Sequence, residues 1–266
     1  MILEAPLAVD VPAGDISAKL AVLIDADNAS PAATAGLLAE VARYGTAHVK
    51  RAYGDWTGTG LHGWKEQLLA WSIAPMQQFA YASGKNATDA AMIIDAMDLL
   101  YTDRFDGFCL VSSDSDFTRL AQRIRESGLT VYGFGQRKTP SSFVKACDKF
   151  IYVENLTAPR AAATARGMAP RPAAGSLPLD AELTVLLRSV VEAGSDDDGW
   201  THLGYAGNMI TKQRPDFDAR SYGHAKLSDL FAATGLFELD RRVPHRGKPA
   251  VIYARDKQRP PDATGK

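Results

Sequence analysis

From residue 20 to residue 153 the chain alternates short runs typical of strands with segments of helical periodicity. The first run, residues 20–24, is apolar throughout and ends in Asp25, which is the pattern of a buried parallel strand. The runs that predict strands are residues 20–24, 47–53, 73–80, 108–111, 130–134 and 150–153. The segments between them predict helices at residues 31–44, 60–71, 88–100, 117–126 and 141–146. This order predicts an α/β fold, with a central parallel sheet flanked by helices on both faces.

The pattern changes at residue 157. Ala, Arg, Pro and Gly dominate residues 157–178 without a hydrophobic period, which predicts a flexible linker. Three helices are then predicted, at residues 179–191, 200–210 and 222–233. Two short strands, at residues 237–239 and 250–253, predict a hairpin around the basic loop 241–248. Three helices and a hairpin outline a small winged-helix-like domain.

We therefore divide the chain of 266 residues into five parts. They are a tail at 1–19, an α/β domain at 20–156, the linker at 157–178, a winged-helix-like domain at 179–256 and a tail at 257–266. Up to residue 158 there are 14 Lys and Arg against 18 Asp and Glu, and beyond it 16 against 13. These small differences suit an acidic site beside a mildly basic binding module.

Three features predict a cytoplasmic protein with no membrane partner. No apolar run reaches the ~18 residues of a membrane span. Residues 1–19 lack the basic region that begins a signal peptide. The two cysteines, Cys109 and Cys147, are expected to be reduced thiols, and no Cys/His spacing resembles a zinc site.

Acidic side chains fall where predicted strands end or helices begin. Asp25 and Asp27 follow the first strand, Asp89 opens the third helix, and Asp114 and Asp116 follow the fourth strand. Residues just past the ends of parallel strands converge on one edge of the sheet. The first and fourth strands commonly flank the point where the strand order reverses, so their trailing loops are expected to face each other.

Carboxylates that are packed together repel unless a cation neutralises them or some take up protons. Oxygen ligands without His or Cys favour Mg²⁺ or Mn²⁺. We expect Asp25, Asp89 and Asp114 to be ligands, directly or through water. Asp116 is expected to be a further ligand or to support one, and Asn28 to orient Asp25 or a metal-bound water. Such ions activate water and clamp a phosphodiester for in-line attack, which is nuclease chemistry.

Structural roles compete with these assignments. A single Asp before a helix is more often an N-cap than a ligand, and this alternative stays open for Asp89 and Asp116. Asp27 could cap the first helix or face water. Asp95 and Asp98, in the same predicted helix as Asp89, are expected to be structural or solvated. The metal site is favoured because three acidic clusters fall at one predicted edge.

Three stretches, in this order, resemble the NYN domain, and specifically the bacterial LabA-like branch of the PIN-like nuclease superfamily. They are VLIDADN at 22–28, GKNATD at 84–89 and VSSDSDF at 111–117. The resemblance runs from residue 20 to residue 154. It implies a Rossmann-like parallel sheet with a metal-dependent ribonuclease site, an endonuclease in our interpretation, at its carboxyl edge. The metal-binding role carries over to Asp25, Asp89 and Asp114, with Asp116 and Asn28 in support.

The second domain resembles an OST-HTH, or LOTUS, domain, which implies an RNA-binding module. The matching stretches are DGW at 198–200, PDFD at 215–218 and YGHAKLSDL at 222–230. Lys226, with Arg220 and His224 nearby, could contact phosphates. Arg241 and Arg242, in the basic loop, belong to the better cationic cluster. The alternative is that these cations only solvate the surface.

Further RNA contacts are predicted at the acidic edge. Lys85 and Asn86, in the middle stretch of the NYN resemblance, and Ser113, beside Asp114, are expected to bind the substrate. Trp56 could stack on a base. The aromatic residues Tyr53 and Trp64 are more often core.

Two other functions stay open. The triplet Asp25-Ala26-Asp27 after an apolar strand mimics the nucleophile motif of haloacid-dehalogenase-type phosphatases, but Ala29 replaces its usual Thr or Val and the Gly-rich flap segment is missing. A non-catalytic or regulatory RNA-binding protein is the other alternative. The sequence also leaves open the RNA target, RNA versus DNA, endo- versus exonuclease cleavage, and whether the chain is a homodimer.

Overall fold

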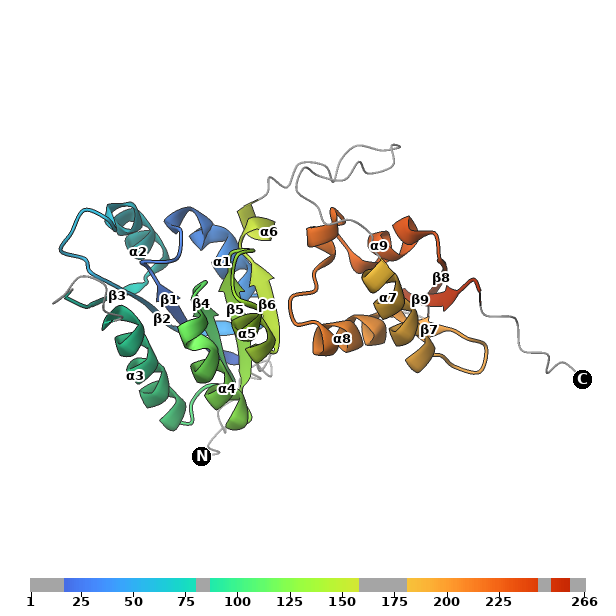
Figure 1. The fold of residues 1–266 in the computed structure, drawn as a ribbon, viewed down its shortest axis with the longest axis horizontal. Helices are drawn as coiled ribbons and strands as arrows, with labels where there is room; N and C mark the ends of the chain where they lie inside the picture. The colour runs from blue at the N-terminus through green and yellow to red at the C-terminus, as the bar shows by residue number, and fades with distance from the viewer. Residues whose placement is uncertain (1–16, 80–86, 158–180, 244–249, 259–266) are drawn as a thin grey trace, which may run out of the picture.

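The computed structural model describes residues 17–79, 87–157, 181–243 and 250–258. The described residues form an α/β domain, up to residue 157, and a small C-terminal domain (Figure 1). The predicted linker and most of both predicted tails lie outside the described residues. The segment 80–86, which carries part of the predicted substrate site, lies outside them as well.

Six parallel strands form the sheet of the α/β domain, in the order β3-β2-β1-β4-β5-β6. They are β1 (Lys19–Asp25), β2 (Thr46–Gly54), β3 (Ala74–Gln77), β4 (Gly107–Val111), β5 (Thr130–Gly135) and β6 (Lys149–Tyr152). After β3 the chain crosses back to place β4 beside β1, so the strand order reverses between these two strands. The predicted parallel α/β sheet is confirmed, and β1 and β4 flank its switch point as expected.

Helices cover both faces of the sheet (Figure 1). One face packs against α1 (Thr34–Val41), α2 (Lys65–Trp71) and α6 (Glu154–Thr157), with the 3₁₀ turns η1 (Pro31–Ala33) and η2 (His62–Trp64). The other face packs against α3 (Ala87–Tyr101), α4 (Thr118–Glu126) and α5 (Ser141–Ala146), with the 3₁₀ turn η3 (Ser115–Phe117). In β1, Leu23 joins the core under α3 to α5, whereas Val22 and Ile24 join the core under α1. Both faces of β1 are buried, and this explains why the run is apolar at every position.

The C-terminal domain combines three helices with a small antiparallel sheet, which is a winged-helix-like arrangement. Its elements are α7 (Ala181–Ala193), β7 (Thr201–His202), α8 (Leu203–Gln213), η4 (Ala219–Tyr222), α9 (Leu227–Thr234), β8 (Phe237–Arg242) and β9 (Val251–Asp256). The strand order is β7-β9-β8. Leu187, Ile210 and Phe231 are fully buried and join α7, α8 and α9 into one core.

Two helices predicted in this domain are wrong at their starts. The helix predicted from residue 200 begins at Leu203, because Thr201 and His202 pair with β9 as strand β7. The helix predicted over 222–233 is interrupted, because Gly223 adopts a left-handed conformation (φ 81°) that ends η4, and α9 starts at Leu227. The hairpin strands are also longer than predicted, so β8 takes in the first residues of the predicted basic loop.

Within the described ranges, no helix is both long and apolar enough to cross a membrane. Cys109 and Cys147 are buried free thiols in the α/β domain.

Candidate metal centre

Asp25 ends β1 at the switch point and is fully buried. Its carboxylate accepts hydrogen bonds from the backbone amide of Asn28 at 3.2 Å, from Asn28 Nδ2 at 2.8 Å and from Ser112 Oγ at 2.7 Å. Burial raises the pKa of Asp25, and the hydrogen bonds from Ser112 and Asn28 oppose that rise. Asn28 therefore hydrogen-bonds directly to the Asp25 carboxylate.

Ser112 connects the two strands that flank the switch point, and the sequence interpretation missed it. Its hydroxyl donates to Asp25 and accepts from the backbone amide of Asp114 at 3.1 Å. Ser112 is itself buried, directly after β4. The only signal in the sequence is its place between an apolar strand and an acidic residue, where a small hydroxyl can reach the neighbouring strand's loop.

Asp89, Asp114 and Asp116 form the acidic cluster of the site. Each offers one carboxylate oxygen, and these three atoms all lie within 4.8 Å of one another. Asp89 lies in the first turn of α3, and Asp114 is the N-cap of η3, where its Oδ1 accepts from the amide of Asp116 at 2.9 Å. One oxygen of Asp114 therefore caps η3. The structural role and a ligand role are compatible at Asp114, because its carboxylate has a second oxygen.

The negative charges of the cluster affect the pKa of Asp89. Its pKa is raised to about 6, first because of partial burial and then because of the negative charges of Asp25, Asp114, Asp116 and Asp27. Asp25 is therefore close enough to add its charge to the cluster, although its oxygens are outside the set of three that approach within 4.8 Å. A bound cation would relieve this repulsion.

Asp27 has a connecting role. Its Oδ2 accepts a hydrogen bond from Thr88 Oγ1 at 2.9 Å, and Thr88 directly precedes Asp89. This bond ties the loop after β1 to the first turn of α3. Asp95, expected to be structural or solvated, accepts from Arg51 at 2.8 Å and from the buried Tyr53 at 2.8 Å, which is a structural arrangement.

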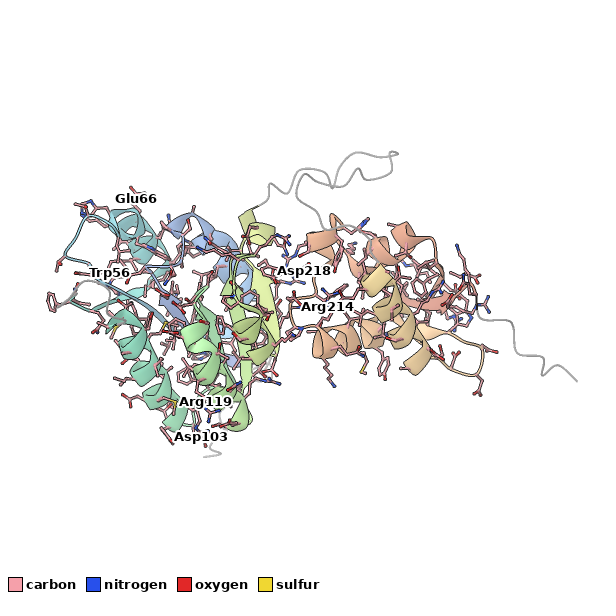
Figure 2. All side chains as sticks on the ribbon, viewed as in Figure 1. Trp56, Glu66, Asp103, Arg119, Arg214 and Asp218 are labelled. Carbon is pink, nitrogen blue, oxygen red and sulfur yellow. The ribbon has the colours of Figure 1, made fainter. Side chains whose placement is uncertain are left out.

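The other predicted residues of the α/β domain are placed as follows. Ser113 Oγ accepts from the amide of Gln136 at 2.8 Å, beside the cluster on the loop after β4. Lys85 and Asn86 lie outside the described residues. Trp64 is a core residue, as is Tyr53, in line with their expected structural role. Trp56 lies far from the C-terminal domain (Figure 2) and its indole donates to the carbonyl of Met76 at 3.1 Å.

The predicted RNA-binding cations of the C-terminal domain differ in exposure and in ion pairing. Arg242 is ion-paired with Asp240 at 2.8 Å and stacks between the rings of Trp200 and Tyr253, with centroid distances of 4.7 and 4.6 Å. Arg241, its neighbour on β8, is exposed. Lys226 is exposed at the N-cap of α9. Arg242 is thus bound within its own domain, whereas Lys226 makes no ion pair with any described residue.

The donor set fits a hard divalent cation. All three members of the cluster are carboxylates, and neither His nor Cys belongs to it. Oxygen donors of this kind suit Mg²⁺ and Mn²⁺ better than the softer metals that select nitrogen or sulfur. Asp89, Asp114 and Asp116 are the residues that could hold such an ion.

Comparisons with known protein families agree with this architecture. The model of the NYN domain matches residues 19–154, just over half of the chain. The chain belongs to the NYN-domain family. In this NYN protein, the model of the OST-HTH/LOTUS domain matches residues 178–249. A PIN-like nuclease domain together with an RNA-binding domain supports a ribonuclease that binds RNA.

Two solved structures are similar to parts of this NYN protein. A protein of unknown function from Vibrio parahaemolyticus is 20% identical over 51% of this chain and 93% of its own, with a TM-score of 0.43. An uncharacterized protein from Nitrosomonas europaea is 39% identical over 36% of this chain and 92% of its own, with a TM-score of 0.29. A search of the curated proteins gave no match.

Proposed function

We propose that this protein is a Mg²⁺- or Mn²⁺-dependent ribonuclease that cuts RNA internally, with its active site at the carboxyl edge of β1 and β4. The observation that carries the proposal is the approach of the Asp89, Asp114 and Asp116 oxygens to within 4.8 Å of one another at that edge. The NYN and OST-HTH/LOTUS domains support RNA as the substrate.

Each residue of the site has a distinct role in this proposal. Asp89, Asp114 and Asp116 hold the cation. Asp25, fixed by Asn28 and Ser112, adds negative charge beside them and keeps the loops after β1 and β4 together. When bound, the divalent cation neutralises the phosphodiester and lowers the pKa of an attacking water. We propose that Ser113, next to Asp114 in the chain, contacts the substrate, as do Lys85 and Asn86.

The experiment is a cleavage assay on matched RNA and DNA, each in linear and circular form, with Mg²⁺, with Mn²⁺ and with EDTA. We expect RNA cleavage only with a divalent cation, and cleavage of the circular substrate, which offers no end to an exonuclease. The variant Asp114→Asn removes one charge of the cluster and should abolish cleavage. The control Asp98→Asn makes the same change on an exposed residue of α3 outside the cluster and should cut like the wild type.

Three results would contradict the proposal. Equal activity of Asp114→Asn and the wild type would remove the cluster from the chemistry. Cleavage in EDTA would remove the cation. Binding of RNA without any cleavage would favour the alternative of a non-catalytic RNA-binding protein.

A further inference from the structure

The C-terminal domain is docked along the free edge of the sheet. In β6, the outer edge strand, the backbone amide of Phe150 donates to the carbonyl oxygen of Pro215 at 2.8 Å. Two side-chain hydrogen bonds extend this contact: Tyr152 Oη to Asp216 at 3.0 Å and Asn155 Nδ2 to Ser221 Oγ at 3.0 Å. The segment between α8 and η4 thus covers a strand edge that would otherwise be open for pairing.

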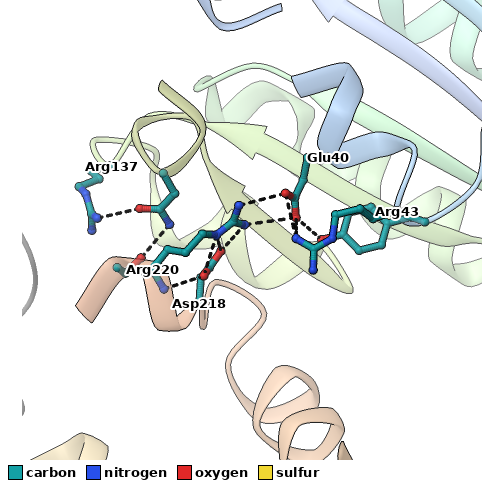
Figure 3. Close-up of polar contacts among 8 residues, drawn as sticks. Glu40, Arg43, Arg137, Asp218 and Arg220 are labelled. Carbon is teal, nitrogen blue, oxygen red and sulfur yellow. Dashed lines mark hydrogen bonds and ion pairs between the residues drawn. The ribbon is translucent and has the colours of Figure 1, made fainter. Parts of the chain in front are cut away.

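Arg220 joins the two domains (Figure 3). Its guanidinium donates to both carboxylate oxygens of Glu40 in α1, at 3.0 and 3.2 Å, and to Asp218 at 2.8 Å. Glu40 is 4% exposed and also accepts from Arg43 at 2.9 Å and Tyr44 at 2.8 Å. Burial alone would raise the pKa of Glu40, but these donors and the charges of the two arginines lower it.

A groove of about 700 Å³ lies beside this contact, between the two domains. One wall is formed by the end of α1 and the start of β6, and the other by α8, the first turn of α9 and the start of β9. Asp218, on the face of the C-terminal domain that is turned toward the α/β domain (Figure 2), belongs to this lining. The volume is in the range of sites that bind a small ligand.

The charges in the groove are unequal in number and in availability. Arg43, Lys149, Arg220 and Lys226 line it, against Glu40 and Asp218. Both carboxylates are already bonded to Arg220. Lys149 and Lys226 make no ion pair with any residue that the structure describes. The groove therefore has two cations available for an anion and no available carboxylate.

Of the two lysines, Lys149 gives the stronger indication that the groove binds an anion. Its ammonium lies 5.5 Å from the centre of the Tyr44 ring, which is stacked on Tyr132. Burial lowers the pKa of Lys149, and the negative charges of Asp218 and Glu40 oppose that shift without forming an ion pair with the ammonium. An anionic ligand in the groove would supply a direct partner.

The wall provided by α8 is shaped for a ligand. Leu203, Ala206 and Ile210 bury one face of this helix in the core of the C-terminal domain. The residues that α8 presents to the groove include Gly204, Gly207, Asn208 and Thr211. Their spacing follows the helical repeat, and they are small or polar. Such a face leaves space for a ligand, and the Asn208 amide offers hydrogen-bond donors, whereas the Thr211 hydroxyl already donates to the carbonyl of Gly207.

We propose that the groove between the two domains binds the sugar–phosphate backbone of single-stranded RNA, with Lys149 and Lys226 contacting phosphates from opposite walls. This inference rests on RNA being the substrate. The docked domain then provides, jointly with the α/β domain, a binding site that neither domain has alone. RNA held there can extend from the groove to the acidic edge of the same sheet.

The test measures binding without cleavage. A fluorescein-labelled single-stranded RNA of mixed sequence is titrated with the full chain in EDTA, and anisotropy is recorded at several salt concentrations. The double variant Lys149→Gln/Lys226→Gln should flatten the dependence of log affinity on log salt by about 1.4, since each contact with single-stranded RNA contributes about 0.7. At 0.1 M salt the same two contacts correspond to roughly 25-fold weaker binding.

Three further variants distinguish a loss of binding at the groove from a general charge effect and from misfolding. Lys145→Gln/Lys212→Gln removes two exposed lysines outside the groove and should bind RNA nearly like the wild type. Asn208→Asp keeps the size of the side chain but adds a negative charge to the groove, and should weaken binding without changing the thermal midpoint. Restoring the positive charges with Lys149→Arg/Lys226→Arg should restore the salt dependence.

The outcomes separate the two proposals. If the groove variants bind like the control pair, or if the wild type does not bind RNA, the groove proposal is overturned. A protein ligand in place of RNA would give the second result. If binding follows the prediction but Asp114→Asn cleaves RNA like the wild type, the groove stands and the proposed active site fails.

Discussion

The pair formed by Glu40 and Arg220 makes a quantitative prediction about how the two domains are held together. Glu40 is 5% exposed at its side chain and Arg220 is 28% exposed, with a shortest distance of 3.0 Å. Breaking a fully buried ion pair costs about 3–5 kcal/mol, and a hydrogen bond to a charged group contributes about 1.5–3 kcal/mol. Arg220 is partly hydrated and Glu40 keeps Arg43, so we expect a coupling free energy of about 2 kcal/mol.

A double-mutant cycle measures this coupling. The free energy of unfolding is determined by urea denaturation for the wild type, Glu40→Gln, Arg220→Gln and the double variant. The control cycle uses Arg119 and Glu126, an Arg–Glu pair at the same 3.0 Å distance but with side chains 74% and 51% exposed. Exposed pairs contribute about 0.2–1 kcal/mol, so the control coupling should be clearly smaller.

The pH dependence gives this prediction a sign. The pKa of Glu40 is lowered from its ordinary value of 4.5, so the ionised carboxylate stabilises the folded state above that pH. The coupling should therefore be complete near neutral pH and should be lost as pH falls below 4.5 through the folded pKa. A coupling no larger than that of the exposed pair, or one that does not change with pH, would refute the docked arrangement.

Two further predictions concern the acidic edge. The pKa of Asp89 is raised to about 6, so ionisation of this group destabilises the folded metal-free protein as pH rises through 6. Because protons compete with the metal for the carboxylate, Mn²⁺ should bind about tenfold more weakly at pH 5 than at pH 7.5, as measured by isothermal titration calorimetry. An affinity independent of pH would contradict a role for Asp89 as a ligand. Ser112→Ala removes the hydroxyl between Asp25 and Asp114, and should lower the cleavage rate by about 10–100-fold and the free energy of unfolding by about 1–3 kcal/mol. The control is Ser127→Ala, at an exposed serine on the turn after α4, which should change neither quantity to this extent.

The sheet and its functional edge could be predicted from local sequence. The central strands β1 and β4 are apolar runs because both of their faces are buried, and the alternation of strands with helices predicts parallel pairing. The reversal of strand order between β1 and β4 then brings Asp25 and Asp114 to the same edge. Asp89 joins them because α3 begins at that edge.

Two kinds of feature could not be predicted: those that depend on pairing between distant segments, and those that depend on the backbone conformation of a single glycine. Thr201 and His202 form a strand only because β9 lies beside them, and Gly223 ends a helical turn through a backbone conformation that hydrophobic periodicity does not report. The ion pair between Glu40 and Arg220 joins residues 180 positions apart. Glu40 lies one helical turn after the buried Leu37 of α1, but nothing in the local pattern reports its partner in the C-terminal domain.

We propose that the carboxylates at the switch point hold a divalent cation that RNA cleavage requires. The most direct measurement is the single-turnover rate of RNA cleavage as Mn²⁺ is titrated into metal-free protein, for the wild type and Asp114→Asn. In the wild type we expect a rate that rises and saturates with Mn²⁺. In Asp114→Asn we expect a rate at least a hundredfold lower at every Mn²⁺ concentration, which is about 3 kcal/mol in activation free energy. Identical titration curves for the two proteins would contradict the proposal.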